Sequence, residues 1–223
     1  MSVHARTGVV VAVDGPSGSG KSSTSRGVAA RLGLRYLDTG AMYRAITWWM
    51  LLHDVPVEDP AAVAARSGEP RIVSGTDPLA PTITVDGTDV SEAIRTPEVT
   101  AVVSAVSAVP QVRARLVRLQ REAIDGGDIV VEGRDIGAVV APDAEVKVFL
   151  TADSSARAAR RAAEEGGSDL AATESSLLAR DRIDSTRTAS PLTRAADAVH
   201  LDTTPYTLEE VVDLIVAMVE DHR

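Results

Sequence analysis

The sequence predicts a single α/β domain in which helices cover both faces of a parallel sheet. Its 223 residues suit one core, and short apolar segments alternate with segments of helical periodicity. A hydrophobic content of 44% with 25% charged residues is ordinary for a globular protein. No apolar run approaches the roughly 18 residues that span a bilayer, so we expect no membrane association.

The predicted strands are short segments that each contain several apolar residues. Val9 to Val13 is continuously apolar, as expected of a strand that is buried on both faces. Four more strands are expected at 34–38, 128–133, 145–152 and 198–204. Because strands alternate with helical segments along most of the chain, we expect a parallel sheet with ligands at the carboxyl ends of its strands.

Helical periodicity fills the intervals. The segment 41–54 places five apolar residues on one face: Met42, Ala45, Ile46, Trp49 and Met50. Pro110 suits the first turn of a helix over 110–124, whose Arg115, Arg118 and Arg121 we expect to form a solvated face. Other helices are expected at 20–32, 154–167, 170–183 and 208–220.

The segment from about 55 to 98 has a different character, because prolines and glycines accumulate there. Its Asp86-Gly87 dipeptide lies between alternating residues and favours a tight hairpin. We therefore expect an antiparallel insert.

Charge and composition limit the partners. A net charge of −9 and a pI of about 4.9 disfavour nucleic acid and anionic membranes. The absence of cysteine is consistent with a reducing compartment, and the N-terminal apolar block is too short for a signal peptide. We expect a cytoplasmic protein. Only two of the 23 basic residues are lysines, and the planar guanidinium of arginine matches phosphate well.

A glycine-rich stretch after the first strand carries the strongest motif. Residues 15–22 fit G-x-x-x-x-G-K-[ST], with a strand before and a helix after. Backbone N–H groups would cradle phosphates, Lys21 would reach the terminal phosphates, and the Ser22 hydroxyl would ligate Mg²⁺. The predicted ATP-binding residues are Gly15, Pro16, Ser17, Gly18, Ser19, Gly20, Lys21, Ser22 and Ser23.

Other motifs separate the classes of nucleotide-binding protein. A GTPase needs N-K-x-D, which Lys147 in "EVKVF" cannot supply, and a motor ATPase usually has a strand ending in Asp-Glu, where this chain has "VVEGRD". A kinase needs an acceptor site, and arginines gather where one would lie: Arg44, Arg134, Arg157, Arg160, Arg161, Arg180, Arg182 and Arg187.

The stretches "VDGPSGSGKSS", "LDTGAMYR", "VVEGRDIG" and "RDRIDSTRTASPL" together resemble the bacterial cytidylate kinases, in the nucleoside monophosphate kinase group of P-loop kinases. The resemblance implies one P-loop kinase domain over residues 1–223 with a three-layer fold. In it, a five-stranded parallel sheet is flanked by helices. It also implies an antiparallel insert for the nucleoside monophosphate at about 55–98 and a short helical lid at about 153–169.

The resemblance also implies roles for individual residues. Arg44 and Arg134 would hold the acceptor phosphate, with Thr39 and Tyr43 nearby. Ser104, Arg113, Asp135 and Arg187 would face the cytosine, while Arg180 and Asp184 would hold the ribose. Lys21, Arg134, Arg157 and Arg161 would be catalytic.

The implied reaction is transfer of the ATP γ-phosphoryl group to CMP or dCMP, with Mg²⁺ bridging the β- and γ-phosphates. A carboxylate such as Asp135 can accept from the cytosine amino group, whereas uracil has an acceptor at that position. No second carboxylate for Mg²⁺ is identified, and the protein is expected to be a monomer.

Alternatives stay open at this point. The acceptor could be UMP, or a hydroxyl compound deprotonated by Asp38 or Asp135. Asp135 could instead be a structural partner of Arg134. A chain that binds ATP without transferring its phosphoryl group, as a regulatory module, is the alternative outside enzymes.

Overall fold

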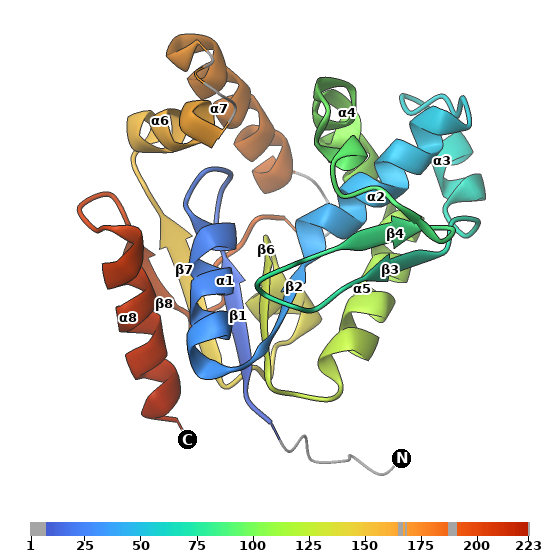
Figure 1. The fold of residues 1–223 in the computed structure, drawn as a ribbon. Coiled ribbons are helices and arrows are strands. Elements are labelled where there is room, and N and C mark those ends of the chain that lie inside the picture. The colour runs from blue at the N-terminus through green and yellow to red at the C-terminus, as the bar shows by residue number, and fades with distance from the viewer. Residues whose placement is uncertain (1–7, 165–166, 168, 187–190, 223) are drawn as a thin grey trace.

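The five predicted strands form one parallel sheet in the order β2-β6-β1-β7-β8 (Figure 1), as expected. The computed structural model describes residues 8–164, 167, 169–186 and 191–222. The strands are β1 (Val10–Asp14), β2 (Arg35–Asp38), β6 (Ile129–Gly133), β7 (Val146–Thr151) and β8 (Val199–Asp202). Asp14 at the end of β1 lies opposite Gly133 of β6, so the two carboxyl ends are neighbours.

Helices cover both faces of the sheet. On one side lie α1 (Lys21–Leu32) and α8 (Leu208–Glu220), and on the other α2 (Thr39–Leu52), α4 (Pro97–Ala108) and α5 (Pro110–Ile124). Alternation along β1 supplies both cores, because Val11 and Val13 pack with α1 and α8 while Val10 and Ala12 pack with α2 and α5. This is the predicted three-layer arrangement.

The proline- and glycine-rich segment holds helix α3 (Pro60–Arg66) and a small antiparallel sheet. Its strands are β3 (Ile72–Ser74), β4 (Ile83–Val85) and β5 (Thr88–Asp89), and the short helix η1 (Ala93–Arg95) follows. The hairpin turns at Asp86 and Gly87, both at positive φ, as expected. Trp49 Nε1 donates to Asp86 Oδ2 at 3.1 Å, which fastens this sheet to α2.

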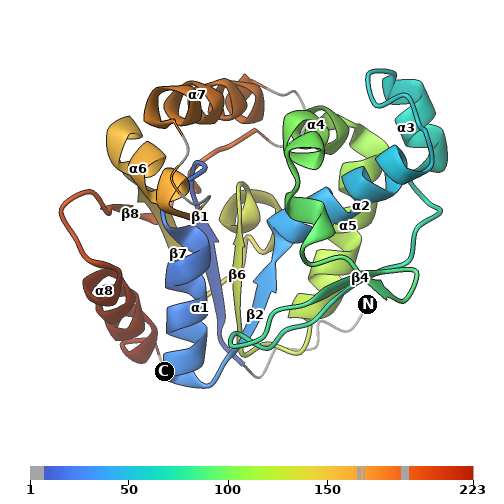
Figure 2. The same ribbon diagram turned by 45° about the horizontal axis from the view of Figure 1, so that its top comes forward.

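Two helices lie beyond the carboxyl edge of the parallel sheet. They are α6 (Ser154–Glu164) and α7 (Leu170–Thr186), and they pack on each other. Figures 1 and 2 both place α7 across from α4, with the loop between β1 and α1 below it. α6 and α7 therefore cover the carboxyl edge of the parallel sheet.

Sequence periodicity did not predict α3, α4 or the π-helical turn η2 (Ile136–Val140). Helix α4 is rich in valine and serine, which have only modest helix propensity. It forms nonetheless because Val99, Val103 and Val106 are buried, so tertiary packing outweighs local preference.

Of the three arginines expected on the solvated face of α5, Arg118 and Arg121 are exposed and Arg115 is half-buried. The Arg115 guanidinium donates to the carbonyl oxygens of Ser67 and Pro70, and Arg121 donates to those of Val139 and Val140 at 2.6 and 3.1 Å. Both therefore join α5 to neighbouring loops. Within the described ranges, no helix has the length and apolarity needed to cross a bilayer.

Candidate active site

The glycine-rich loop connects β1 to α1, and its backbone requires glycine. Gly15, Gly18 and Gly20 all have positive φ, and a Cβ at Gly15 would lie 2.1 Å from the Leu150 carbonyl oxygen. Lys21 Nζ donates to the Pro16 carbonyl oxygen at 2.6 Å, which folds the lysine back along the loop. The loop thus presents its amides and its lysine at one end of the sheet.

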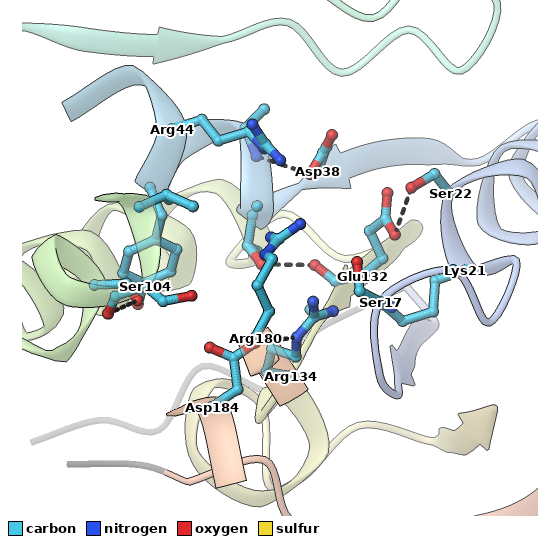
Figure 3. A pocket seen from close by; sticks show the side chains of 18 of the residues that line it. Ser17, Lys21, Ser22, Asp38, Arg44, Ser104, Glu132, Arg134, Arg180 and Asp184 are labelled. Atoms are coloured by element: carbon cyan, nitrogen blue, oxygen red, sulfur yellow. Dashed lines mark hydrogen bonds and ion pairs between the residues drawn. The ribbon is translucent and has the colours of Figure 1, made fainter. Parts of the chain in front are cut away.

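One pocket at the carboxyl edge of the sheet gathers the predicted residues (Figure 3). From the loop and α1 it is lined by Ser17, Gly18, Gly20, Lys21, Ser22 and Ser23. Gly15, Pro16 and Ser19 lie outside this lining. Pro16 supports the loop from behind, because its carbonyl oxygen accepts from both Lys21 and the Ser19 hydroxyl.

The acceptor residues implied by the resemblance line the same pocket, although they come from five parts of the chain. They are Thr39, Tyr43, Arg44, Ser104, Arg113, Arg134, Asp135, Arg180 and Asp184. Arg187 lies outside the described residues. The fold therefore brings the predicted donor and acceptor residues together in a single pocket.

A buried ion pair forms part of the lining of this pocket. Arg113 and Asp135 bond each other, and their side chains are only 5% and 6% exposed. The Arg113 guanidinium also lies over the Tyr43 ring, 5.4 Å from its centroid. Asp135 thus pairs with Arg113, whereas the sequence suggested Arg134 as its structural partner. The Arg113–Asp135 pair presents a carboxylate and a guanidinium group side by side.

Arg134 joins three parts of the site. Its Nε donates to Asp184 Oδ2 at 2.9 Å and its Nη1 to the Gly15 carbonyl oxygen at 3.0 Å. It therefore ties the residues after β6 both to α7 and to the glycine-rich loop.

Guanidinium groups crowd this pocket. Burial, reinforced by neighbouring Arg180 and Arg161, lowers the pKa of Arg44 to about 9. Burial and neighbouring Arg134 likewise lower the pKa of Arg180. Like charges that depress one another's pKa are relieved by an anion placed among them, so the arrangement suits a phosphate ligand.

The arginines of α6 have different surroundings. Arg161 lines the pocket, whereas Arg157 does not and instead bonds the Ser17 carbonyl oxygen at 2.9 Å and the Asp181 carboxylate. Asp181 also accepts from the Ser17 N–H at 3.1 Å. Arg160 bonds Thr203. Arg157 and Arg160 thus fasten α6 to the loops beneath it.

Sequence reasoning missed Glu132, the carboxylate that lies beside Ser22. Its Oε2 accepts from the Ser22 hydroxyl at 3.0 Å, and its Oε1 accepts from the Tyr36 hydroxyl. Burial raises the pKa of Glu132, lowers that of nearby Lys21 and raises that of Tyr36. The segment "VVEGRD" could have pointed to Glu132. It ends strand β6, which pairs with β1, the strand that leads into the glycine-rich loop.

The oxygens of Ser22 and Glu132 fit a hard divalent cation such as Mg²⁺. In the part of the chain that the structure describes, no group of three or more acidic or histidine side chains could hold a metal alone. A cation here would take its remaining oxygens from phosphates and water, which is how Mg²⁺ is commonly bound.

Asp14, the last residue of β1, organises the turn after β6. Its carboxylate oxygens accept from the Ile136 and Gly137 N–H groups, both at 2.8 Å. Burial outweighs these bonds and raises its pKa to about 6. This turn directly follows Arg134 and Asp135. Asp14 therefore helps to fix the backbone position from which both of these side chains extend.

Comparison with known proteins gives consistent results. The sequence profile of the family described as cytidylate kinase matches residues 11–221. A cytidylate kinase of Streptomyces griseus is 61% identical over 221 residues, covering 98% of this chain and 96% of the relative. One of Streptomyces avermitilis is 59% identical over 217 residues, covering 96% and 94%.

Among solved structures, a shikimate kinase from Acinetobacter baumannii in complex with shikimate resembles this chain with a TM-score of 0.50. It is 12% identical, and the match covers 98% of this chain and 96% of that one. A likeness at this identity concerns the fold alone, and it agrees with the predicted kinase architecture.

The raised pKa of Asp14 gives the first testable prediction. In the folded protein this pKa is about 6, above the ordinary value of 3.8, so the folded state holds the proton more tightly than the unfolded chain. The resulting stabilisation is complete below pH 3.8 and is lost as the pH rises through 6. Relative to Asp14→Asn, the unfolding free energy of the natural protein should fall by about 1 kcal/mol between pH 5 and 7.5.

Urea denaturation of both proteins across this pH range measures the difference. A difference that stays constant with pH would show that Asp14 does not titrate in this window.

Proposed function

This chain belongs to the cytidylate kinase family, and we propose that it transfers the γ-phosphoryl group of ATP to CMP or dCMP, giving ADP and CDP or dCDP. The observation that carries the proposal is the shared pocket. A phosphate loop with Lys21 and Ser22 faces an acceptor set that includes Arg134 and the Arg113–Asp135 pair. A regulatory module that only binds ATP would need no such second set.

At the donor end, the loop amides and Lys21 bind the ATP phosphates, and the positive end of α1 adds to their attraction. The full loop, residues 15–23, forms this ATP site. Lys21 already lies along the loop through its bond to Pro16, so little reorganisation is needed when phosphate replaces that carbonyl as its partner.

At the acceptor end, Arg44 and Arg134 bind the CMP phosphate, with Thr39 beside them. Asp135 accepts from the cytosine amino group, while Arg113 and Ser104 complete the edge of the base. Uracil would present an acceptor to Asp135. A buried carboxylate that is left without a hydrogen-bond donor costs about 1–3 kcal/mol of binding free energy. Arg180 and Asp184 hold the sugar, and Arg187 is included from the resemblance alone.

The transfer breaks the bond between the γ-phosphorus and its bridging oxygen and forms one to a CMP phosphate oxygen. That oxygen is already anionic near neutral pH, so no general base is needed. This disfavours the hydroxyl acceptors, since Asp135 is engaged with Arg113 and Asp38 caps α2 through the Ala41 N–H. The arginines instead neutralise the charge of the transition state.

Ser22 and Glu132 would hold Mg²⁺, Ser22 through its hydroxyl oxygen and Glu132 through that hydroxyl or a bound water. The bound cation neutralises charge on the β- and γ-phosphates. On the protein side, the hydrogen bond from Ser22 to Glu132 turns the serine proton away and leaves its lone pairs for a cation.

The two outer segments would close over the substrates. The insert at about 55–98 would close on CMP and the lid at about 153–169 on ATP, which excludes water and limits ATP hydrolysis. α7 would continue the cover. We further propose a monomer that acts in the cytoplasm.

An acceptor panel tests the reaction. With ATP and Mg²⁺, coupled assays should give the highest kcat/KM for CMP or dCMP, with UMP and AMP lower and shikimate inactive. Fastest turnover on any other acceptor would refute the assignment, and ATP binding without transfer would favour a regulatory module.

The lid arginines give a paired prediction. Because Arg161 lines the pocket, Arg161→Ala should lower kcat by roughly 100-fold or more, as loss of a group that stabilises transition-state charge does. Arg157→Ala, which removes the bonds to Ser17 and Asp181, should mainly raise the KM for ATP. Steady-state kinetics of both variants decide between them, and the opposite pattern would assign the transition-state role to Arg157.

A further inference from the structure

We propose that Tyr36 is a positioning residue for the cation-binding end of the site. Its hydroxyl holds Glu132 so that this carboxylate accepts the Ser22 proton and leaves the Ser22 oxygen ready for a cation. This inference rests on the function proposed above and extends it to a residue outside the pocket that holds the substrates.

The sheet register places Tyr36 within reach of Glu132. Strands β2 and β6 pair in parallel, with Tyr36 opposite Val130 and Asp38 opposite Glu132. Residues 130 and 132 point to the same face because side chains alternate along a strand. Tyr36 therefore reaches Glu132 diagonally, a spacing that long side chains can bridge.

Both ends of Tyr36 are fixed. Its ring is buried in the core beneath α1, with only 2% of the residue exposed. Its backbone N–H donates to the Thr76 carbonyl oxygen at 2.9 Å, which joins the outer edge of β2 to the insert. The packing of the ring and the backbone hydrogen bond therefore fix the position of the Tyr36 hydroxyl.

The two oxygens of Glu132 have separate partners. Oε1 accepts from Tyr36 and Oε2 accepts from Ser22 at 3.0 Å; Figure 3 shows Ser22 and Glu132 facing each other. A serine hydroxyl has one proton and two lone pairs. When the proton points to Glu132, the lone pairs point elsewhere, and a cation can take one of them.

Loss of the Tyr36 hydroxyl would leave Oε1 without its donor, in a buried carboxylate that Asp38 and Lys21 influence electrostatically. An orphaned buried oxygen favours reorientation of the whole carboxylate, for example toward Lys21. The Ser22 proton would then lose its fixed acceptor. Outer-shell partners of this kind typically change metal affinity by about 10–100-fold when they are removed.

The test measures ADP affinity by calorimetry, first with EDTA and then over a Mg²⁺ series. Tyr36→Phe keeps the buried ring and removes only the hydroxyl. We expect its Mg²⁺-free ADP affinity to match the natural protein, while the gain in affinity that Mg²⁺ brings falls by about 10-fold. Tyr206→Phe is the matched control, because Tyr206 is 41% exposed and should retain the full gain.

Glu132→Gln separates this inference from the function on which it rests. If Glu132→Gln loses the Mg²⁺-dependent gain while Tyr36→Phe keeps it, Tyr36 is not a positioning residue and the Glu132 assignment stands. If Tyr36→Phe weakens ADP equally with and without Mg²⁺, its role is structural only and the inference fails. If neither variant changes the gain, both assignments are wrong.

Discussion

The buried contact between Asp14 and the turn after β6 determines how the two halves of the site meet. Asp14 directly precedes the phosphate loop, and its carboxylate binds the Ile136 and Gly137 amides. Arg134, from the segment after β6, makes the reciprocal contact by donating to the Gly15 carbonyl oxygen in the phosphate loop. Because β1 and β6 are adjacent strands, about 4.8 Å apart, the glycine-rich loop and the turn after β6 emerge side by side.

This arrangement concentrates charge that is only partly compensated. Burial raises the pKa of Asp14 and lowers those of Arg44 and Arg180, so each charged form is less favourable than in water. Anionic substrates would offset this cost among the arginines. α7 contributes two carboxylates at a spacing of three residues, since Asp181 holds Arg157 and Asp184 holds Arg134. The helix that covers the pocket thus also orients the arginines below it.

Sequence reasoning succeeded where local chemistry restricts the residue. The phosphate loop requires glycine at positive φ, and the strands require apolar runs, so both were predictable. Glu132 was missed because its partners, Ser22 and Tyr36, become its neighbours only through the sheet order β2-β6-β1. Helix α4 was missed because its valines favour strands locally. The backbone carbonyls that Arg115 and Arg121 bind leave no signal in the sequence.

The central claim is that donor and acceptor bind in one pocket at the ends of β1 and β6. A compound that joins adenosine to cytidine through five phosphates tests it directly by calorimetry. We predict that one molecule binds per chain and that its binding prevents both ATP and CMP from binding. If CMP still binds to protein saturated with this compound, the two nucleotides occupy separate sites and the account is wrong.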